Sequence, residues 1–314
     1  MTVNKTSEPL FPKEKKDTIR ENYGDWQTNY EFAKSVCLYL KNRGIVPDIV
    51  VEPTCGVGNF IAAAIDVFET VKKVYGVEIF KGYVDQTEKK LQEYQKNNLI
   101  VSYELYNADV FNFDFREIAN QNPNQNILVI GNPPWVTNSG LGKNDGVNLP
   151  VKGNINKTKG IEAITGKGNF DIAESICNQI IDAFSHHGNT HIALLVKNSV
   201  VKNIIHRQHF HPRRIQDVRQ LVFDAKKEFN VSVPASLFEC HIGNDCQKEC
   251  ISYDFYTKRI THSFGWVNEA FVSNIQDYGR TSFLDGQSPL IWRSGIKHDC
   301  SKVMELSLND STYQ

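Results

Sequence analysis

Short β-branched runs alternate with helical segments through the first half of the chain, and this alternation limits the fold more than any other feature. The expected strands cover residues 48–52, 74–78, 101–106 and 127–131, and the expected helices cover 28–43, 58–68 and 83–96. Strands that are separated by helices of this length form right-handed crossovers and pair in parallel. We therefore predict an α/β fold with a mostly parallel central sheet.

Residues 139–169 interrupt this pattern. They contain seven glycines, five asparagines and five lysines. A segment of this length without regular structure is often functional when it lies inside a compact domain, so we predict a mobile loop. The pattern then resumes with a helix at 170–184 and strands at 191–196, 218–223, 231–239 and 251–256.

The composition is that of a globular protein. The chain has 314 residues, of which 40% are hydrophobic, and this is enough for one large α/β domain and part of a second. Residues 1–20 form a polar tail without the apolar segment of a signal peptide, and no apolar run reaches membrane-spanning length. We therefore expect a cytoplasmic protein that does not enter a membrane.

The cysteines do not predict a metal centre. They number seven, and most lie within apolar segments, as expected of reduced thiols. Cys240, His241, Cys246 and Cys250 are close in the sequence but contain no Cys-x-x-Cys pair. Because Cys240 also falls at the end of an expected strand, we expect no bound metal.

A polar turn, Asn132-Pro133-Pro134-Trp135, follows the fourth expected strand. Neither proline can donate a hydrogen bond to a sheet, so the strand must end here. At the carboxyl end of a parallel strand, the turn would present an amide side chain, a backbone carbonyl and an aromatic ring to the crevice where α/β proteins bind ligands. These groups can hold a planar base by its exocyclic amine. The alternative interpretation is a stiff turn without chemistry.

A glycine turn follows the first expected strand. It reads Glu52-Pro53-Thr54-Cys55-Gly56-Val57-Gly58 and precedes an expected helix. Glycines at this spacing allow a tight turn and a close approach of the backbone to a ligand at the amino end of the helix. The third glycine of the dinucleotide fingerprint is missing, which argues against a pyrophosphate ligand.

Two acidic residues follow the next two strands. Glu78 can accept hydrogen bonds from a ribose diol, and Ile79 beside it can pack against an adenine ring. Asp109, followed by Val110, is placed to accept from an adenine amino group. Two acids near a glycine turn suit a cationic nucleoside, and S-adenosylmethionine is the obvious candidate.

These motifs together resemble those of the N6-adenine DNA methyltransferases of bacterial restriction–modification systems. The glycine turn resembles the cofactor motif of that family, and Asn132 to Trp135 matches its catalytic motif. Residues 24–28 resemble its amino-terminal cofactor motif, with Asn29 in place of the usual proline after Thr28. Residues 169–171 resemble the segment after the mobile loop. The order of the motifs is that of the group with a carboxy-terminal recognition domain.

The resemblance implies a Rossmann-like S-adenosylmethionine-dependent methyltransferase fold. It also implies methyl transfer from S-adenosylmethionine to the N6 amine of a flipped-out adenine. The catalytic residues would be Asn132, Pro133, Pro134 and Trp135, and the rings of Trp135 and Phe229 would stack on the base. The cofactor-binding residues would be Thr28, Glu52, Pro53, Cys55, Gly56, Gly58, Glu78, Ile79, Asp109, Val110 and Asn132.

The same resemblance sets the expected domains and partners. Residues 21–250 would form the catalytic domain, and 251–314 would hold part of a smaller recognition domain or a linker, with residues 288–295 as the opening of the recognition domain. The expected partners are double-stranded DNA and a cognate restriction endonuclease, and we expect a monomer. Two alternatives stay open, namely a methyltransferase acting on an RNA base or a protein glutamine amide, and a non-catalytic DNA-binding subunit.

The charge distribution allows a nucleic-acid partner. The net charge is −1, but residues 197–227 contain eight lysines and arginines and only two aspartates. A basic face on a neutral protein suits phosphate binding, whereas the alternative is an ordinary solvated surface.

Overall fold

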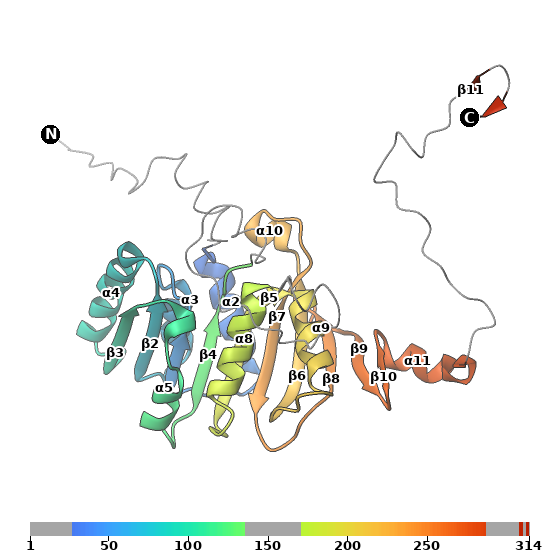
Figure 1. Ribbon diagram of the computed structural model, residues 1–314. Helices are drawn as coiled ribbons and strands as arrows, with labels where there is room; N and C mark the ends of the chain where they lie inside the picture. Colours follow the sequence, from blue (N-terminus) through green and yellow to red (C-terminus); the bar gives the residue numbers. More distant parts are fainter. Residues whose placement is uncertain (1–26, 136–170, 287–307, 310–311, 314) are drawn as a thin grey trace. The chain divides into compact units, whose positions relative to one another are not determined.

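The computed structural model describes residues 27–135, 171–286, 308–309 and 312–313. The chain divides into a first unit, Met1–Gln276, and a second unit, Asp277–Gln314. The first unit contains a ten-stranded sheet with the strand order β10-β9-β8-β6-β7-β5-β4-β1-β2-β3 (Figure 1).

The strands of this sheet are β1 (Ile49–Glu52), β2 (Lys73–Glu78), β3 (Ser102–Asn107), β4 (Ile127–Gly131), β5 (Thr190–Lys197), β6 (Ile215–Phe223), β7 (Ala235–Ile242), β8 (Glu249–Asp254), β9 (Ile260–Val267) and β10 (Ala270–Val272). The helices of eight residues or more are α2 (Tyr30–Asn42), α3 (Asn59–Val67), α4 (Lys81–Lys96), α8 (Ile172–Ala183) and α9 (Asn198–Arg207). Shorter helices are η1 (Val110–Asn112), α5 (Arg116–Gln121), α10 (Ala225–Phe229), α11 (Ile275–Thr281) and η2 (Ser282–Leu284). The second unit contains η2 and the antiparallel pair of β11 (Leu308–Asn309) and β12 (Thr312–Tyr313).

The predicted α/β fold is confirmed. Strands β3, β2, β1, β4 and β5 are parallel neighbours, and β7 runs antiparallel between β5 and β6, as Figure 1 shows. The order β3-β2-β1-β4-β5 is that of a doubly wound sheet, in which the chain starts at β1 and returns to β4 on its other side. The carboxyl ends of β1 and β4 therefore form the topological switch point.

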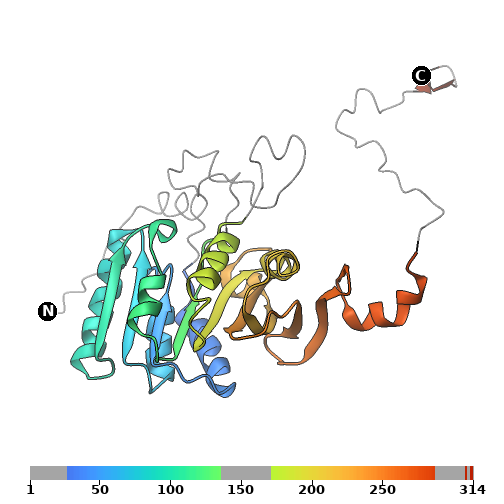
Figure 2. The same cartoon turned by 60° about the horizontal axis from the view of Figure 1, so that its bottom comes forward.

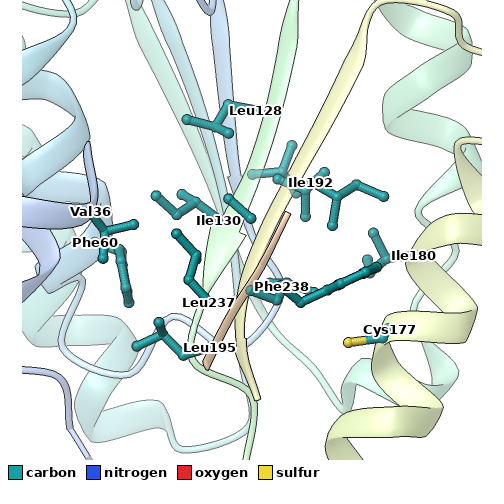
Figure 3. Close-up of a cluster of buried hydrophobic side chains, with 14 of the residues drawn as sticks. Val36, Phe60, Leu128, Ile130, Cys177, Ile180, Ile192, Leu195, Leu237 and Phe238 are labelled. Atoms are coloured by element: carbon teal, nitrogen blue, oxygen red, sulfur yellow. The ribbon is translucent and has the colours of Figure 1, made fainter. Parts of the chain in front are cut away.

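The sheet carries helices on both faces. Helices α2 and α3 pack against one another on one face, and α8 and α9 do so on the other (Figure 2). Figure 3 shows the resulting core, with Val36 and Phe60 on one side of the sheet and Cys177 and Ile180 on the other. Strand β4 lies between these layers, and all five of its residues are buried. This burial on both faces explains why β4 reads as a continuous apolar run.

The amino end of α2 differs in detail from the expectation. The helix expected at 28–43 begins at Tyr30, and its cap is Asn29, whose side chain accepts a hydrogen bond from the Glu31 N–H at 2.8 Å. Asparagine and threonine are both good caps, and the backbone path decides between them. Thr28 is thereby left outside the helix, with its side chain buried.

Strands β8 to β10 extend the main sheet. β8 pairs in parallel with β6, and β9 and β10 follow in antiparallel order. The first unit therefore continues to Gln276, beyond the boundary at residue 250 that the composition suggested. The assignment of the later residues to a recognition domain stays a prediction, and residues 288–295 lie outside the described part of the chain.

The basic stretch does not form a single open face. Its cations are distributed over β5, α9, β6, α10 and the segment between α9 and β6, and several of them have partners within the described residues. Lys197 lies 2.7 Å from an Asp171 oxygen, and Arg219 lies 2.9 Å from an Asp217 oxygen. The Arg213 side chain is only 11% exposed. The net charge of the stretch therefore overstates the positive surface.

The cysteine group belongs to the sheet. Cys240 and Cys250 are buried on β7 and β8, and Cys246 is exposed between these strands. Among residues 27–135 and 171–286, no cluster of three or more potential metal-binding side chains occurs. None of the described helices has the length and apolar character needed to cross a membrane.

A buried ionic network joins α2 to the sheet. Glu239 on β7 is fully buried and accepts hydrogen bonds from Tyr39 at 2.7 Å and from Arg43 at 3.2 Å. The Nε2 atom of His191 on β5 lies 3.0 Å from the same carboxylate. Burial alone would raise the pKa of Glu239, but the contact with His191, the Tyr39 hydrogen bond and the charge of Arg43 outweigh it, so the pKa is lowered.

We predict that Glu239→Gln lowers the free energy of unfolding by about 2–4 kcal/mol, because it removes the charge that these buried donors require. Since the pKa of Glu239 is lower in the folded state, the loss should be full above the ordinary glutamate pKa and should shrink as the pH falls below it. Urea denaturation at several pH values measures this. Glu249→Gln, at an exposed position of β8, is the control. Equal stability of both variants would contradict the role of the network.

Candidate active site

The two predicted turns meet at the carboxyl ends of β1 and β4. A side chain placed on Gly131, the last residue of β4, would have its Cβ 3.2 Å from Cγ of Glu52 and 3.7 Å from Cδ of Pro53. The absence of a side chain at Gly131 therefore allows the Asn-Pro-Pro-Trp turn to approach the glycine turn closely. The sequence predicted each turn, and the structure brings them together.

The glycine turn uses a backbone conformation that favours glycine. Gly56 and Gly58 have φ values of 51° and 72°. The Gly58 N–H donates to the Cys55 carbonyl at 2.7 Å, and the Cys55 N–H donates to the Val77 carbonyl at 2.9 Å. Burial raises the pKa of the Cys55 thiol well above its ordinary value. Cys55 therefore serves to anchor the turn, and it is poorly suited to act as a nucleophile.

Glu52 faces the protein interior. Its side chain accepts from the Ile61 N–H at 3.3 Å, in the first turn of α3. Burial raises the pKa of Glu52 well above its ordinary range, and the neighbouring charge of Glu78 acts in the same direction. The carboxyl group therefore satisfies the amino end of α3, which is a structural role that the sequence motif alone did not indicate.

Glu78 shapes the glycine turn directly. One carboxylate oxygen accepts from the Gly56 N–H at 2.8 Å, and the other accepts from the Phe80 N–H at 2.8 Å. A carboxylate oxygen can accept more than one hydrogen bond, so these contacts are compatible with a ribose beside them. Ile79 is 41% exposed, which is unusual for an isoleucine at the end of a buried strand. Its position suits an apolar ring of a ligand.

Asp109 and Val110 lie at the start of η1. The Asp109 side chain accepts from the Phe111 N–H at 3.0 Å and from the Asn112 side-chain amide at 3.1 Å. Val110 is buried, and its carbonyl accepts from the Gln179 side chain at 2.9 Å. Asp109 thus caps a short helix, while the parallel register of β2 and β3 brings it to the same edge as Glu78.

Several buried polar atoms at this edge have no hydrogen-bond partner within the described part of the chain. They include Thr28 Oγ1 before α2, Thr54 Oγ1 in the glycine turn and Asn198 Oδ1 at the start of α9. Buried polar atoms are normally paired, so unpaired ones need an explanation. Their position beside the two turns is consistent with a polar ligand that is not included in the structure.

The Asn-Pro-Pro-Trp turn is anchored by its tryptophan. Asn132 and Pro134 are partly exposed, whereas Pro133 is buried. The Trp135 ring is 7% exposed, and its Nε1–H donates to the Leu195 carbonyl of β5 at 3.0 Å. A buried indole with its N–H paired holds the turn in place.

The rings of Trp135 and Phe229 do not form the open slot that base stacking on both faces would require. Their centroids are 5.2 Å apart and their planes are inclined by 65°. Phe229 is also buried, and both rings belong to an aromatic cluster with Phe32, Phe223 and Phe255. The two predicted rings are in contact, but they pack edge to face within an aromatic cluster instead of lying parallel, and their stacking on a base stays a prediction.

The sequence did not predict the residues of α4 and α3 whose side chains donate hydrogen bonds to the glycine turn and to the segment before α2. Thr87 and Lys90 on α4 donate to the carbonyls of Gly56 and Val57 at 2.9 and 2.7 Å. Asn59 donates to the Thr28 carbonyl at 2.8 Å. Residues three apart on a helix share a face, and this spacing was the signal that the sequence offered for Thr87 and Lys90.

The loop predicted at 139–169 and the motif residues 24–26, 169 and 170 lie outside the described residues. Asp171 is the last residue of the motif at 169–171. It caps α8 by accepting a hydrogen bond from the Ala173 N–H at 3.0 Å. Its other oxygen pairs with Lys197 at the end of β5. Asp171 thus links the two elements that follow the Asn-Pro-Pro-Trp turn.

Comparison with known proteins supports a methyltransferase relationship. No protein-family model matches the chain. The type II methyltransferase M.NspV of Nostoc sp. (strain ATCC 29411 / PCC 7524) is 38% identical over 293 residues, which are 93% of this chain and 60% of that protein. The similarity thus extends over both turns and most of the sheet.

Two solved structures show a more distant similarity. The methyltransferase subunit of a type I restriction-modification system from Streptococcus thermophilus matches with a TM-score of 0.46 and 14% identity, over 82% of this chain and 52% of that one. The type IIL restriction-modification enzyme MmeI, solved in complex with DNA, matches with a TM-score of 0.44 and 14% identity, over 76% of this chain and 36% of that one. Both TM-scores are below 0.5, so the assignment relies on the Nostoc protein and the strand order. The chain has a Rossmann-like, doubly wound α/β fold and is similar in sequence to a type II methyltransferase, of whose length it spans about 60%.

Proposed function

We propose that the chain is the catalytic part of a DNA methyltransferase that transfers a methyl group from S-adenosylmethionine to the N6 amine of adenine. The observation that carries this proposal is that the Asn132-Pro133-Pro134-Trp135 turn and the glycine turn begin at the carboxyl ends of the paired parallel strands β4 and β1, at the switch point. A group that grips an exocyclic amine thereby lies beside a loop suited to a nucleoside cofactor. The homology to a type II methyltransferase supports the same conclusion.

The residues at the edge of the sheet fit S-adenosylmethionine. When bound, this cofactor supplies the methyl group that is transferred. We assign the ribose to the vicinity of Glu78 and the adenine ring to the exposed side chain of Ile79. The buried hydroxyls of Thr28 and Thr54, which have no hydrogen-bond partner among the described residues, offer further polar contacts. The glycine turn provides a backbone without side chains at Gly56 and Gly58, which a ligand can approach closely.

Asn132 and Pro133 would act on the target amine. The lone pair of an adenine N6 amine is delocalised into the ring, which makes the nitrogen a poor nucleophile. If the Asn132 side-chain oxygen and the Pro133 carbonyl each accept one N–H of the amine, the nitrogen is drawn toward a tetrahedral geometry and its lone pair is freed. Positioning and electrostatic stabilisation would thus provide most of the rate enhancement.

The proline-rich turn is well suited to hold these acceptors. Two prolines restrict its backbone, and the Trp135 indole attaches it to the Leu195 carbonyl. Acceptors that are fixed before the substrate arrives need no reorganisation during the reaction. A base in duplex DNA must leave the stack to reach this turn, so we infer that the enzyme flips its target.

We predict that Asn132→Ala lowers the rate of methyl transfer by about 100-fold or more, because a preorganised acceptor is lost. Binding of S-adenosylmethionine should change little. Tritium transfer to unmethylated DNA measures the rate, and titration calorimetry measures cofactor affinity. Asn189→Ala is the control, because Asn189 is exposed and precedes β5, at the amino ends of the parallel strands and away from the site. Equal losses of affinity and rate in the Asn132 variant would contradict the proposed role.

We predict that Gly58→Ala weakens cofactor binding and destabilises the protein by about 1–3 kcal/mol. The residue has a φ of 72°, and an added Cβ would lie 2.7 Å from the Thr87 Cγ2. Gly82→Ala is the matched control, because a Cβ at this position in α4 would have no atom within 4 Å. Calorimetry and urea denaturation distinguish the two. If both variants bind S-adenosylmethionine like the unchanged protein, the glycine turn is not the cofactor site.

A further inference from the structure

Two polar side chains of α4 contact consecutive peptide groups of the glycine turn. Thr87 is 1% exposed, and its hydroxyl donates to the Gly56 carbonyl at 2.9 Å. Lys90 is half-buried, and its Nζ donates to the Val57 carbonyl at 2.7 Å. We propose that Thr87 and Lys90 are positioning residues, which orient the amides of the glycine turn and thereby set the affinity for the cofactor. This inference rests on the proposed function.

The geometry of the peptide bond explains how the two contacts act. In a planar trans peptide, the carbonyl and the following N–H point in opposite directions. Holding the Gly56 carbonyl toward α4 therefore turns the Val57 N–H away from α4, and this N–H lies 3.3 Å from the Gln27 side-chain oxygen. Holding the Val57 carbonyl fixes the next peptide, whose Gly58 N–H donates to Cys55 at 2.7 Å. Both peptide planes of the turn are thus set by α4.

Lys90 extends this control to the segment before α2. Its Nζ also donates to Asn59 Oδ1 at 3.0 Å, and Asn59 Nδ2 donates to the Thr28 carbonyl at 2.8 Å. Thr28 has a buried hydroxyl without a partner among the described residues. One ammonium group therefore connects two segments that are far apart in the sequence and that both contribute to the proposed cofactor site.

The environment of Lys90 favours this role over an ordinary ion pair. No ion pair of the described residues includes Lys90, and the acceptors of its hydrogen bonds are a carbonyl and an amide. A hydrogen bond from a charged donor to such an acceptor is stronger than one from a neutral donor. Burial lowers the pKa of Lys90, whereas the charge of Glu52 opposes this effect.

Three substitutions on α4 test the inference. Thr87→Val removes the hydroxyl and keeps the side-chain shape, and Lys90→Met removes the ammonium group and keeps most of the length. Lys89→Met is the control, because Lys89 is an exposed neighbour on the same helix. Hydrogen exchange of the peptide that spans the glycine turn reports its order without any cofactor. Calorimetry and steady-state kinetics report the affinity for S-adenosylmethionine.

Thr87→Val and Lys90→Met should speed exchange in the glycine turn and weaken cofactor affinity by about three- to tenfold each, the loss expected for one buried hydrogen bond. The KM for the cofactor should rise while kcat at saturating cofactor stays close to that of the unchanged protein, and Lys90→Arg should recover part of the affinity. Exchange and affinity equal to those of Lys89→Met would overturn the positioning role alone. If the unchanged protein does not bind S-adenosylmethionine, the proposed function fails. Hydrogen exchange of the glycine turn needs no cofactor, so unchanged exchange in the Thr87 and Lys90 variants would separately refute the role of their hydrogen bonds to the turn.

Discussion

The parallel pairing of β1 with β4 is the constraint on which the site depends. The crossovers that follow these two strands leave on opposite faces of the sheet, so a crevice opens where the strands end. The glycine turn follows β1 and the Asn-Pro-Pro-Trp turn follows β4, so the two turns begin at neighbouring strand ends, where Gly131 lies close to Glu52 and Pro53. An error in the register of this strand pair would separate the proposed cofactor site from the proposed acceptor site.

Each turn is secured by hydrogen bonds to elements outside it. The Trp135 indole attaches the Asn-Pro-Pro-Trp turn to β5, and α4 with Glu78 holds the glycine turn. The carboxylates that a motif comparison would assign to ligand binding therefore also have structural roles. Glu52 satisfies the amino end of α3, and Asp109 caps η1. Such anchoring is what a site needs if it is to hold its geometry before the substrate binds.

The sequence predicted the parallel strands β1 to β5 closely, because buried parallel strands read as short apolar runs between helices. It did not predict β9 and β10, and it placed β7 at 231–239 rather than at Ala235–Ile242. It also predicted the position of both turns, since these follow from local strand endings. The predictions from the sequence failed where contacts between distant residues determine the exposure or the orientation of a side chain. The partner of Lys197, Asp171, comes from another segment, and the burial of Arg213 depends on the packing around it, so the basic stretch seemed more exposed than it is. The tilt between Trp135 and Phe229 depends on the whole aromatic cluster. Helix α9 was missed although Val200, Val201, Ile204 and Ile205 form a buried stripe at helical spacing.

The central claim concerns which atom receives the methyl group, and it can be tested directly. Tritium-labelled S-adenosylmethionine would be incubated with the protein and unmethylated DNA, and the digested nucleosides would be separated. The account predicts label in N6-methyladenosine, because the proposed mechanism assigns Asn132 and Pro133 the role of accepting from the exocyclic amine of a flipped base. Label in another nucleoside, or no label in DNA with clear label in RNA or protein, would contradict it.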